Sequence, residues 1–554
     1  KTPREMMTGM KRDRRVGGVD RQEEDGSTAE PKTFHTVLRL DQKRDVLFQK
    51  NFGTILECIQ QNIASEEKRF KAIRLCAENV LNVFEESYNK NDDWKQVVAM
   101  TLLPDITRLA YKCPFKEVRE PMREFLKRHD AEKSELERRT SYFVPEGKII
   151  SVSPKEEETR HMFEDLFASR GRLSHLDQIL GWHPHFLQAF TMTTEFLMKE
   201  DGALPLCFRN YLAILASSLH GCEYIVSSQE REFVFNRGDP TWLEGVGKSP
   251  KKVQGVMKLA RLLAHCPWKI TPDHIRDVVE GANSWTITEL VQILAILCTY
   301  SSLCGLVFGM GLLPEIDMDK PSRARKLRKY YEVDTTTREQ AQKNNENLFK
   351  KLGHSSESRM EDDRSDQKAI AFVDICCDTG ADLKSKFPRY TGTKLQRYQD
   401  FNIKTEKLHR RQDYDWRSHA YGLMTRFYPG FSPMLNSEFD VIYNLTYKRL
   451  GKAVNVDTGP FRRAVWYYVH RLYGIENDDY NYACINNYLN RQVKMFIKKC
   501  ACFPQDITRK DYEIFGYDFT DDEKCHVTLL VVEARRQASL VFGLKALGKY
   551  LSSQ

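Results

Sequence analysis

The chain has few of the features that point to a metalloprotein. Its 554 residues include 14 cysteines, but the sequence contains no Cys-x-x-Cys pair and no cysteine–histidine spacing typical of a zinc site. Cys376 and Cys377 are adjacent, and one residue separates Cys500 from Cys502, so neither pair has a usual metal-ligand spacing. Unpatterned cysteines in a long chain are typical of a reduced, intracellular protein. We therefore expect free thiols, no metal and no cofactor.

The chain also lacks a signal peptide and a strong charge of one sign. It opens on Lys1 without a charged-then-apolar leader, so we expect its true start to lie upstream. A net charge of +8 is mild and does not by itself indicate nucleic-acid binding, which needs charge concentrated on one face. We expect a cytoplasmic protein. The basic cluster Lys11–Arg15 leaves nuclear localisation open beside a solvated charge run.

Charged residues are absent between Glu289 and Glu315. This length would cross a bilayer core of about 30 Å. Polar residues interrupt the stretch, however, and Gly309-x-Gly311 indicates a helix end. A helix that is apolar all round is also what the centre of a large bundle requires. We therefore expect 290–304 to be a buried core helix and not a membrane span.

The length exceeds one ordinary core, and an apolar share of 41% suits globular domains. Residues 1–32 are charged and dotted with glycine and serine, which predicts a disordered tail. Residues 316–412 form a predicted linker that is largely disordered. Its basic run 323–329 is typical of a solvated surface, with nucleic acid or anionic lipid as the alternative partner.

Apolar periodicity elsewhere predicts an all-α protein. In the extra segment 33–140 the spacing predicts a helix over 70–88, a second ending at Pro104 and a third over 118–128. Further helices are predicted at 157–169, 184–199, 206–235, 252–265, 272–281 and 286–304. After the linker they are predicted at 436–451, 459–473, 481–502, 509–516 and 524–551.

One stretch, 443–533, has the residue types that capture a free amino acid. Such a ligand carries a carboxylate and an ammonium, so it needs a bidentate cation and an anion close together. Arg462 and Glu523 are suitable types, since guanidinium matches carboxylate geometry in a rigid fork. Tyr447, Phe461 and Phe519 offer apolar walls, and Thr446 and Thr458 offer polar edges. Sequence spacing alone does not bring these residues together.

The motifs in this stretch resemble the C-terminal domain of the sestrins. They are Asn-Leu-Thr-Tyr (444–447), Val-Asp-Thr (456–458), Arg-Arg-Ala-Val-Trp (462–466), Tyr-Gly-Ile (473–475) and Asp-Asp-Tyr-Asn-Tyr (478–482). The region from Ser141-Tyr-Phe-Val-Pro onward is similar to the sestrin N-terminal domain. The resemblance implies two alkyl hydroperoxidase D-like helical halves, 141–315 and 413–554, in one globular body. It does not extend to residues 1–140, whose role it leaves open.

Sestrins are stress-induced, leucine-binding regulators of the target-of-rapamycin pathway, and the resemblance implies a role for each matching residue. Arg462 would bind the leucine carboxylate and Glu523 its ammonium. Thr446 and Tyr447 match the lid over the ligand, Thr458 and Phe461 the pocket lining, and Phe519 and His526 its wall and edge.

Two positions depart from the family pattern. Arg449 replaces a lid threonine, and Gly516 replaces a tryptophan at the pocket floor. Losing part of a contact area of about 150–250 Å² is worth about 1–2 kcal/mol, or roughly tenfold in affinity. We therefore expect weaker amino-acid binding, or a shift toward a bulkier side chain such as methionine. Gly516→Trp should tighten leucine binding, provided that the ring finds room against Phe519.

Other residues match surfaces by which sestrins bind a partner. Asp478 and Asp479 match the acidic pair that holds the GATOR complex, with an exposed helix N-cap as the alternative. Arg491, Lys494 and Lys498 recur at three and four and share one helix face. They match a basic patch implicated in the same regulation, and a solvated helix face has the same pattern.

Peroxide-reducing relatives in the alkyl hydroperoxidase family use a helix that carries Cys-x-x-Cys-x-x-x-His, and residues 208–224 resemble this element. Cys222 occupies the first position and Tyr224 stands near it, but Ile225 replaces the resolving cysteine and Gln229 the histidine. Glutamine does not serve as a base, and His220 would point away from Cys222 on a continuous helix. Cys222 and Tyr224 remain the catalytic candidates, with little turnover expected and a buried, inert cysteine as the alternative.

These observations together predict a stress-responsive leucine sensor that inhibits target-of-rapamycin signalling. It would bind the activating GATOR complex and be released by leucine. The alternatives are a hydroperoxide reductase that uses Cys222 and a scaffold that needs no ligand.

Overall fold

The computed structural model describes residues 53–61, 65–90, 103–132, 138–318, 409–516 and 518–554. These residues are mostly helical, which confirms the all-α class. The strands among them are two residues long. β1 (His409–Arg410) pairs in parallel with β4 (Ile475–Glu476), and β2 (Arg449–Leu450) pairs antiparallel with β3 (Ala453–Val454). The predicted tail 1–32 and residues 319–408 of the predicted linker lie outside the described residues.

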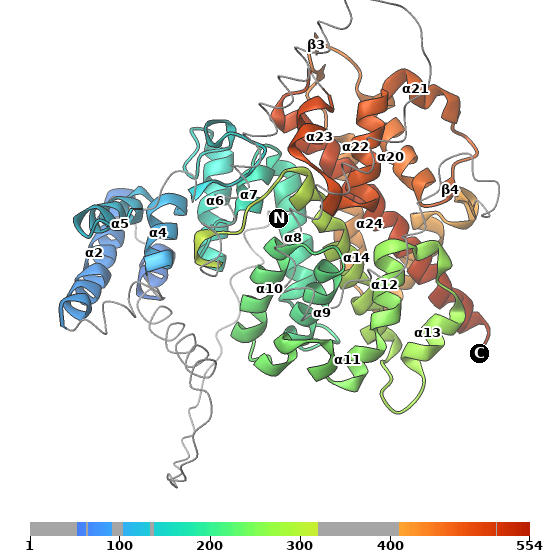
Figure 1. Cartoon of the computed structure of the whole chain (residues 1–554), viewed down its shortest axis with the longest axis horizontal. Coiled ribbons are helices and arrows are strands. Elements are labelled where there is room, and N and C mark those ends of the chain that lie inside the picture. Colours follow the sequence, from blue (N-terminus) through green and yellow to red (C-terminus); the bar gives the residue numbers. More distant parts are fainter. Residues whose placement is uncertain (1–52, 62–64, 91–102, 133–137, 319–408, 517) are drawn as a thin grey trace, which may run out of the picture. The chain divides into compact units, whose positions relative to one another are not determined.

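The described part of the extra N-terminal segment contains α2 (Glu66–Lys90), α4 (Leu103–Lys112) and α5 (Lys116–Arg128), packed on one another (Figure 1). Ile73, Ala77 and Phe84 are buried, as the periodicity of α2 predicts. The expectation that Pro104 ends a helix is wrong, because α4 begins at Leu103 and continues past it. Proline is tolerated in a first helical turn, where its missing N–H would have no partner.

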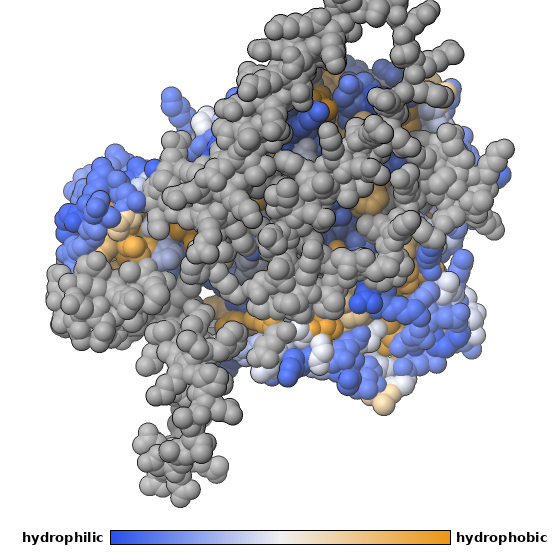
Figure 2. Space-filling view, viewed as in Figure 1, coloured by the Kyte–Doolittle hydropathy of each residue, from blue (hydrophilic) through white to orange (hydrophobic). Residues whose placement is uncertain are grey.

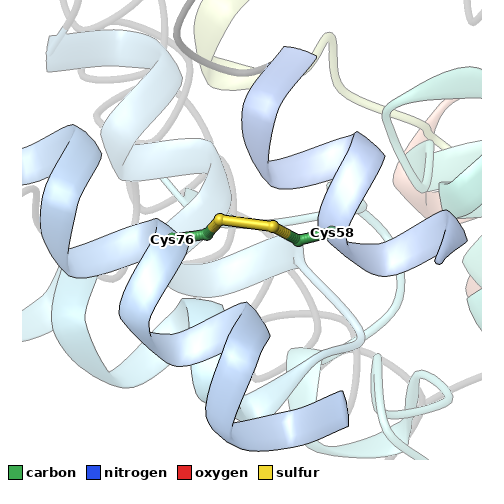
Figure 3. The surroundings of a disulfide bond; sticks show 2 residues. All are labelled: Cys58 and Cys76. Atoms are coloured by element: carbon green, nitrogen blue, oxygen red, sulfur yellow. A yellow bond between two sulfur atoms is a disulfide. The ribbon is translucent and has the colours of Figure 1, made fainter. Parts of the chain in front are cut away.

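A disulfide joins Cys58, in the helical residues 53–60, to Cys76 of α2 (Figure 3). The expectation of free thiols is therefore wrong for this pair. The ten other cysteines within the described ranges are free. The pairing depends on how two helices pack, which the spacing of cysteines along the chain does not reveal.

A buried ion cluster anchors α4 to the following domain. Asp317 lies in the 3₁₀ turn Ile316–Met318, and its Oδ2 accepts from Arg108 Nε at 3.0 Å, Arg172 Nη2 at 2.5 Å and Arg231 Nη1 at 2.8 Å. The Asp317 side chain is fully buried. Burying a carboxylate costs free energy unless it is paired, so this residue ties three separate segments together.

After α5 the chain forms a succession of helices, most of which lie close to their predicted ranges. They are α6 (Glu157–Arg170), α7 (His175–Leu180), α8 (Pro184–Met198), α9 (Leu206–Ser218), α10 (Glu223–Phe235), α11 (Lys251–Gly255), α12 (Met257–His265), α13 (Pro272–Val279) and α14 (Ile287–Gly309). The predicted helix 206–235 is divided at Gly221, whose φ of +63° ends a right-handed helix. In Figure 2 the described surface around α11 and α13 is largely hydrophilic.

The C-terminal region begins with a π-helical turn, Trp416–Ala420, and continues through seven α-helices in its described residues. They are α18 (Tyr421–Phe427), α19 (Phe431–Asn444), α20 (Gly459–Leu472), α21 (Ile485–Tyr488), α22 (Arg491–Cys502), α23 (Arg509–Ile514) and α24 (Asp521–Ser552). The predicted helix 436–451 ends earlier, at Asn444, and the chain then forms the β2–β3 hairpin. Short 3₁₀ turns are interspersed at Glu146–Lys148, Pro240–Glu244, Val246–Lys248, Pro267–Lys269, Arg411–Asp413, Tyr482–Cys484 and Pro504–Asp506.

Helix α14 packs along α24 at the centre of the core (Figure 1). It is long and apolar enough to cross a membrane, with a mean hydropathy of 2.0, but that apolar window is entirely buried within the protein. This confirms the prediction of a core helix. Gly305 and Gly309 allow the close approach of other helices: a Cβ at Gly305 would lie 2.9 Å from the Cys500 carbonyl oxygen, and one at Gly309 would lie 2.7 Å from Thr528 Cγ2.

All of the described residues belong to one compact unit, 51–554. The predicted boundaries at 140, 315 and 412 therefore stay predictions. At the two ends of the predicted linker, Ile316–Met318 is a 3₁₀ turn and His409–Arg410 is strand β1.

Candidate functional site

The first candidate site lies where the segment 445–458 meets the start of α24. Thr520 and Glu523 have the spacing of a capping box, and the Thr520 N–H donates to Glu523 Oε2 at 2.8 Å. The sequence thus places Glu523 in the first helical turn. Its side chain is only 7% exposed, so the carboxylate is held in a largely water-free position.

Arg462 projects from the first turns of α20 on the other side of this segment. Its Nε donates to the Tyr443 carbonyl oxygen at 2.7 Å, and its Nη1 donates to Thr458 Oγ1. Thr458 Oγ1 also lies 3.0 Å from Thr446 Oγ1. The guanidinium is half-buried, and this burial lowers the pKa of Arg462. No carboxylate of the described residues forms an ion pair or hydrogen bond with it.

Glu523 does not meet Arg462 directly. Its Oε1 accepts from the Gly451 N–H at 3.0 Å and lies 3.3 Å from Arg449 Nε. Arg449 Nη2 also donates to Asp522 Oδ2 at 2.5 Å. Arg449, which the sequence marked as a departure from the expected pattern, therefore pairs with the carboxylate that was predicted to bind the ligand's ammonium. The sequence identified this replacement but not its partner.

Tyr447 makes a contact that the sequence did not predict. Its hydroxyl lies 2.8 Å from Nδ1 of His183, a fully buried residue at the start of α8, and His183 Nε2 lies 3.0 Å from the Asp522 carbonyl oxygen. Burial lowers the pKa of His183 to about 4, so its ring is neutral near pH 7. Nε2 then donates to the carbonyl while Nδ1 accepts from Tyr447. The residues around His183, Gly181-Trp-His-Pro184, have the composition of a helix break and carry no sign of this contact.

His526, the predicted edge residue, lies beside His183 with 5.6 Å between ring centroids. Its Nε2 is 3.3 Å from the Ile442 carbonyl oxygen. Burial, with a smaller contribution from His183, lowers the pKa of His526 to about 3. The two neutral rings therefore lie between α8 and α24, and the ring of His183 also contacts that of Tyr447.

Phe461 and Phe519 meet edge to face with 5.8 Å between ring centroids, and their role as walls of a ligand pocket stays a prediction. The expectation for Gly516 is wrong. Gly516 has a φ of +53°, and a Cβ added there would lie 2.1 Å from Phe519 Cδ2. The ring of Phe519 fills the space into which a tryptophan at Gly516 would project, so Gly516→Trp does not find the room that tighter leucine binding would need.

The acidic pair lies at a second location. Asp478 and Asp479 are exposed and line an open, polar hollow of about 310 Å³, together with Gln412, Asp415, Ser418 and Asn477. The N-cap alternative is wrong, because Asn481 caps the next turn, accepting from the Ala483 N–H at 3.0 Å. The two carboxylates therefore face solvent at a concave surface.

The predicted basic face is on α22. Arg491 is exposed, and Lys494 and Lys498 are half-buried, whereas Phe496 and Ile497 of the same helix are buried. Lys494 Nζ donates to Asn486 Oδ1 at 2.6 Å. The helix thus presents three cations on its outer side, as the spacing predicts.

The peroxidase candidates lack the surroundings of a reactive thiol. Cys222 is buried at the N-cap of α10, and burial followed by a hydrogen bond with Cys304 raises its pKa well above the ordinary value. The Tyr224 hydroxyl donates to Glu315 Oε1 at 2.9 Å, and Gln229 Oε1 accepts from Asn210 Nδ2 at 3.0 Å. Because the thiolate is the nucleophile, this environment disfavours peroxide reduction.

No hydrogen bond joins His220 to Cys222 among the described residues, although the continuous helix on which the prediction was based is interrupted between them. The chain turns at Gly221, and His220 Nε2 lies 3.0 Å from Arg535 Nη2 and 2.8 Å from Ser301 Oγ. The histidine belongs to a buried polar cluster between α14 and α24.

Comparison with known proteins gives a consistent match. The family model described as "PA26 p53-induced protein (sestrin)" matches residues 139–368 and 323–551. The "Sestrin homolog" of Dictyostelium discoideum is 33% identical over 496 residues, which cover 81% of this chain and 82% of that protein. "Sestrin-1" of Macaca fascicularis is 34% identical over 446 residues (74% and 90%), and "Sestrin-2" of Homo sapiens is 32% identical over 437 residues (74% and 91%).

Proposed function

The chain belongs to the sestrin family, and from this premise we propose that it is a stress-responsive sensor of a free apolar amino acid of the leucine type. In this proposal it inhibits target-of-rapamycin signalling by binding the activating GATOR complex. The ligand releases it from that partner. In this proposal it acts in the cytoplasm, and entry into the nucleus stays an alternative.

Arg462 is the observation that carries the proposal. Its guanidinium is half-buried and hydrogen-bonded to Tyr443 and Thr458, but no described carboxylate pairs with it. Partial burial of an unpaired cation costs free energy, which a ligand carboxylate in bidentate geometry would offset. The neighbouring Phe461 and Phe519 supply an apolar surface for the ligand's side chain.

The partner surface is supported by a separate observation. Asp478 and Asp479 are exposed at a concave, polar surface, and neither caps a helix. Carboxylates placed in this way are suited to receive cationic side chains of another protein.

The proposal is tested by calorimetry of the purified chain against a panel of amino acids. Arg462→Ala should reduce binding by roughly 2–5 kcal/mol, because it removes the partner of the ligand carboxylate. Arg463→Ala, which removes an exposed neighbouring charge, is the matched control and should bind as wild type does.

Partner capture separates the two surfaces. Asp478→Ala combined with Asp479→Ala should lose the GATOR complex and still bind the amino acid, whereas Arg462→Ala should keep the complex at high leucine. If Arg462→Ala behaves like wild type in both assays, the sensor proposal is wrong.

One observation favours a second candidate, a scaffold that needs no ligand. Arg449 already neutralises Glu523, so the segment 445–458 is held against α24 by the protein's own ion pairs. Partner binding that is indifferent to every amino acid tested would favour this candidate. The hydroperoxide reductase alternative has no such support, because Cys222 is buried and its pKa is raised.

A further inference from the structure

We propose that Arg449 takes the place of the ligand's ammonium group. The site between Arg462 and Glu523 then selects an apolar carboxylic acid without an α-ammonium, of the 2-oxo acid class. The inference rests on the proposed function in one respect, namely that a small ligand brings its carboxylate to Arg462, and it replaces the amino acid of that proposal with the corresponding 2-oxo acid.

The argument begins with Glu523, whose oxygens already have partners. Oε1 accepts from the Gly451 N–H at 3.0 Å and pairs with Arg449 Nε at 3.3 Å, while Oε2 accepts from the Thr520 N–H at 2.8 Å. The side chain is 7% exposed, which leaves little room for another group. A ligand ammonium would have to displace a guanidinium to reach this carboxylate.

Arg449 is firmly held. Its Nη2 donates to Asp522 Oδ2 at 2.5 Å and to Thr520 Oγ1 at 3.3 Å, so its departure would leave two carboxylates without their cation. Arg449 is 38% exposed, but Glu523 is only 7% exposed, and leaving a buried carboxylate without its cation is unfavourable. A ligand that needs this place therefore binds at a disadvantage.

The hairpin that carries Arg449 is fixed as well. Lys452, in the turn of the hairpin, is exposed, and its Nζ lies 2.8 Å from Oδ1 of Asp518, which precedes α24. Gly451, at a φ of +59°, approaches so closely that a Cβ there would lie 3.0 Å from Asp518 Cβ. The hairpin thus contacts the residues that lead into α24 at several points, and Arg449 does not move independently of it.

Arg462 is in the opposite situation. It donates to one carbonyl and one hydroxyl, and the nearby Asp457 carboxylate is instead engaged by the Gly459 N–H at 2.8 Å. A free amino acid carries two charges. Its carboxylate would meet Arg462, a cation that forms no ion pair among the described residues, whereas its ammonium would need Glu523, which already pairs with Arg449. The ammonium would meet Arg449, which carries the same charge.

A 2-oxo group suits the remaining contacts. It adds no charge and accepts hydrogen bonds. The hydroxyls of Thr446 and Thr458 lie 3.0 Å apart beside Arg462, and because one donates to the other, the second keeps a hydrogen that it can donate to the 2-oxo group. The apolar side chain would lie against Phe461 and Phe519, as for an amino acid. The 2-oxo acid with leucine's side chain, 4-methyl-2-oxopentanoate, is the appropriate test ligand.

The experiment is calorimetric titration of the full chain with leucine and with 4-methyl-2-oxopentanoate. The wild-type protein should bind the 2-oxo acid at least tenfold more tightly than leucine. Arg449→Thr should shift the ratio of the two affinities at least tenfold toward leucine, because Glu523 is then free for an ammonium. Lys510→Gln, which removes an exposed cation of α23 outside the hairpin, is the control and should leave the order unchanged.

The outcomes separate the inference from the function on which it rests. Wild-type protein that binds leucine as tightly as the 2-oxo acid, or more tightly, overturns the inference and leaves the sensor proposal standing. Because this comparison uses the wild-type chain, it holds even if Arg449→Thr fails to fold. Binding of neither compound to the wild-type chain overturns both.

Discussion

Gly516 shows how one backbone angle limits a binding site. It has a φ of +53°, a backbone conformation that residues with a Cβ rarely adopt, and the Phe519 ring lies directly over it. The pattern of the family suggests a missing contact at this position. The structure places the Phe519 ring in this space, 2.1 Å from where a Cβ at position 516 would lie.

Gly516→Trp should therefore destabilise the fold. The left-handed conformation costs about 1–2 kcal/mol for a residue with a Cβ, and overpacking adds typically 1–3 kcal/mol. Urea unfolding would measure the loss. Gly422→Ala is the control, because Gly422 lies in α18 with no atom in the way of a Cβ, and this change should stabilise by up to about 1 kcal/mol. A Gly516→Trp protein as stable as wild type would contradict the close packing.

Sequence reasoning identified most residues of the candidate site by type but not their partners. Phe461 and Phe519 do meet, and Thr446 does reach Thr458. Arg449 was identified only as a departure from a pattern, since nothing local indicates that its guanidinium reaches residues more than seventy positions away. His183 was not identified as a site residue, because the residues around it indicate only a helix break.

At the level of elements, α24 carries charges inside the core. Arg536 Nη2 lies 2.7 Å from Glu438 Oε1 of α19 and 2.6 Å from Glu533 Oε2, and all three side chains are at most 2% exposed. One guanidinium faces two carboxylates in a region without water. Burial raises the pKa of Glu533 to about 8, against the attraction of Arg536.

This raised pKa predicts a pH-dependent stability. Between about pH 4.5 and 8 the folded state keeps a proton on Glu533 that the unfolded state has released, so stability from this group falls as pH rises through that window. Each tenfold change in proton affinity is worth about 1.4 kcal/mol, so the total over this window is on the order of 5 kcal/mol. Glu533→Gln should gain stability relative to wild type as pH rises from 5 to 8.5.

The measurement is urea unfolding at several pH values, expressed as the difference between variant and wild type. That difference cancels the histidines, whose lowered pKa values act in the opposite direction below pH 6.5. Glu513→Gln, on the exposed face of α23, is the control and should show a difference independent of pH. A flat difference for Glu533→Gln would show that the buried carboxylate is ionised throughout.

The sequence predicted long, strongly periodic elements better than it predicted their interruptions. Helices α6, α8 and α20 end within two residues of their predicted limits, because apolar spacing and proline mark them. The division between α9 and α10 was missed, since Gly221 lies within an otherwise continuous apolar pattern. The β2–β3 hairpin was missed because its strands are too short for alternation to show.

At the scale of the whole molecule, Asp317 joins α4 of the extra segment to the helical body. Its three partners are Arg108 of α4, Arg231 of α10, and Arg172. Because they lie far apart in the sequence, no sequence motif predicts the cluster. The sequence left residues 33–140 without a role. The ion cluster attaches the described part of that segment to the helical body, which gives that part a structural role.

Arg108→Ala should loosen this docking. It removes the cation that α4 contributes and leaves Asp317 with one partner fewer, and breaking a buried pair typically costs about 3–5 kcal/mol. Hydrogen exchange should then rise in α4 and α5 and remain unchanged in α14. Arg231→Ala, whose side chain is 32% exposed, is the control and should have a smaller effect. Unchanged protection of α4 in the Arg108 variant would contradict an anchoring role.

The packing of α14 against α24 also has a consequence for biosynthesis. The ribosome releases the 23 residues of α14, with mean hydropathy 2.0, before residues 310–520 have been made, and only then does α24 follow. During that interval the most apolar helix among the described residues lacks a principal covering element, and exposed apolar surface of this kind is what holdase chaperones recognise. Nascent chains halted before residue 521 should therefore accumulate on chaperones, whereas chains that include α24 should be released.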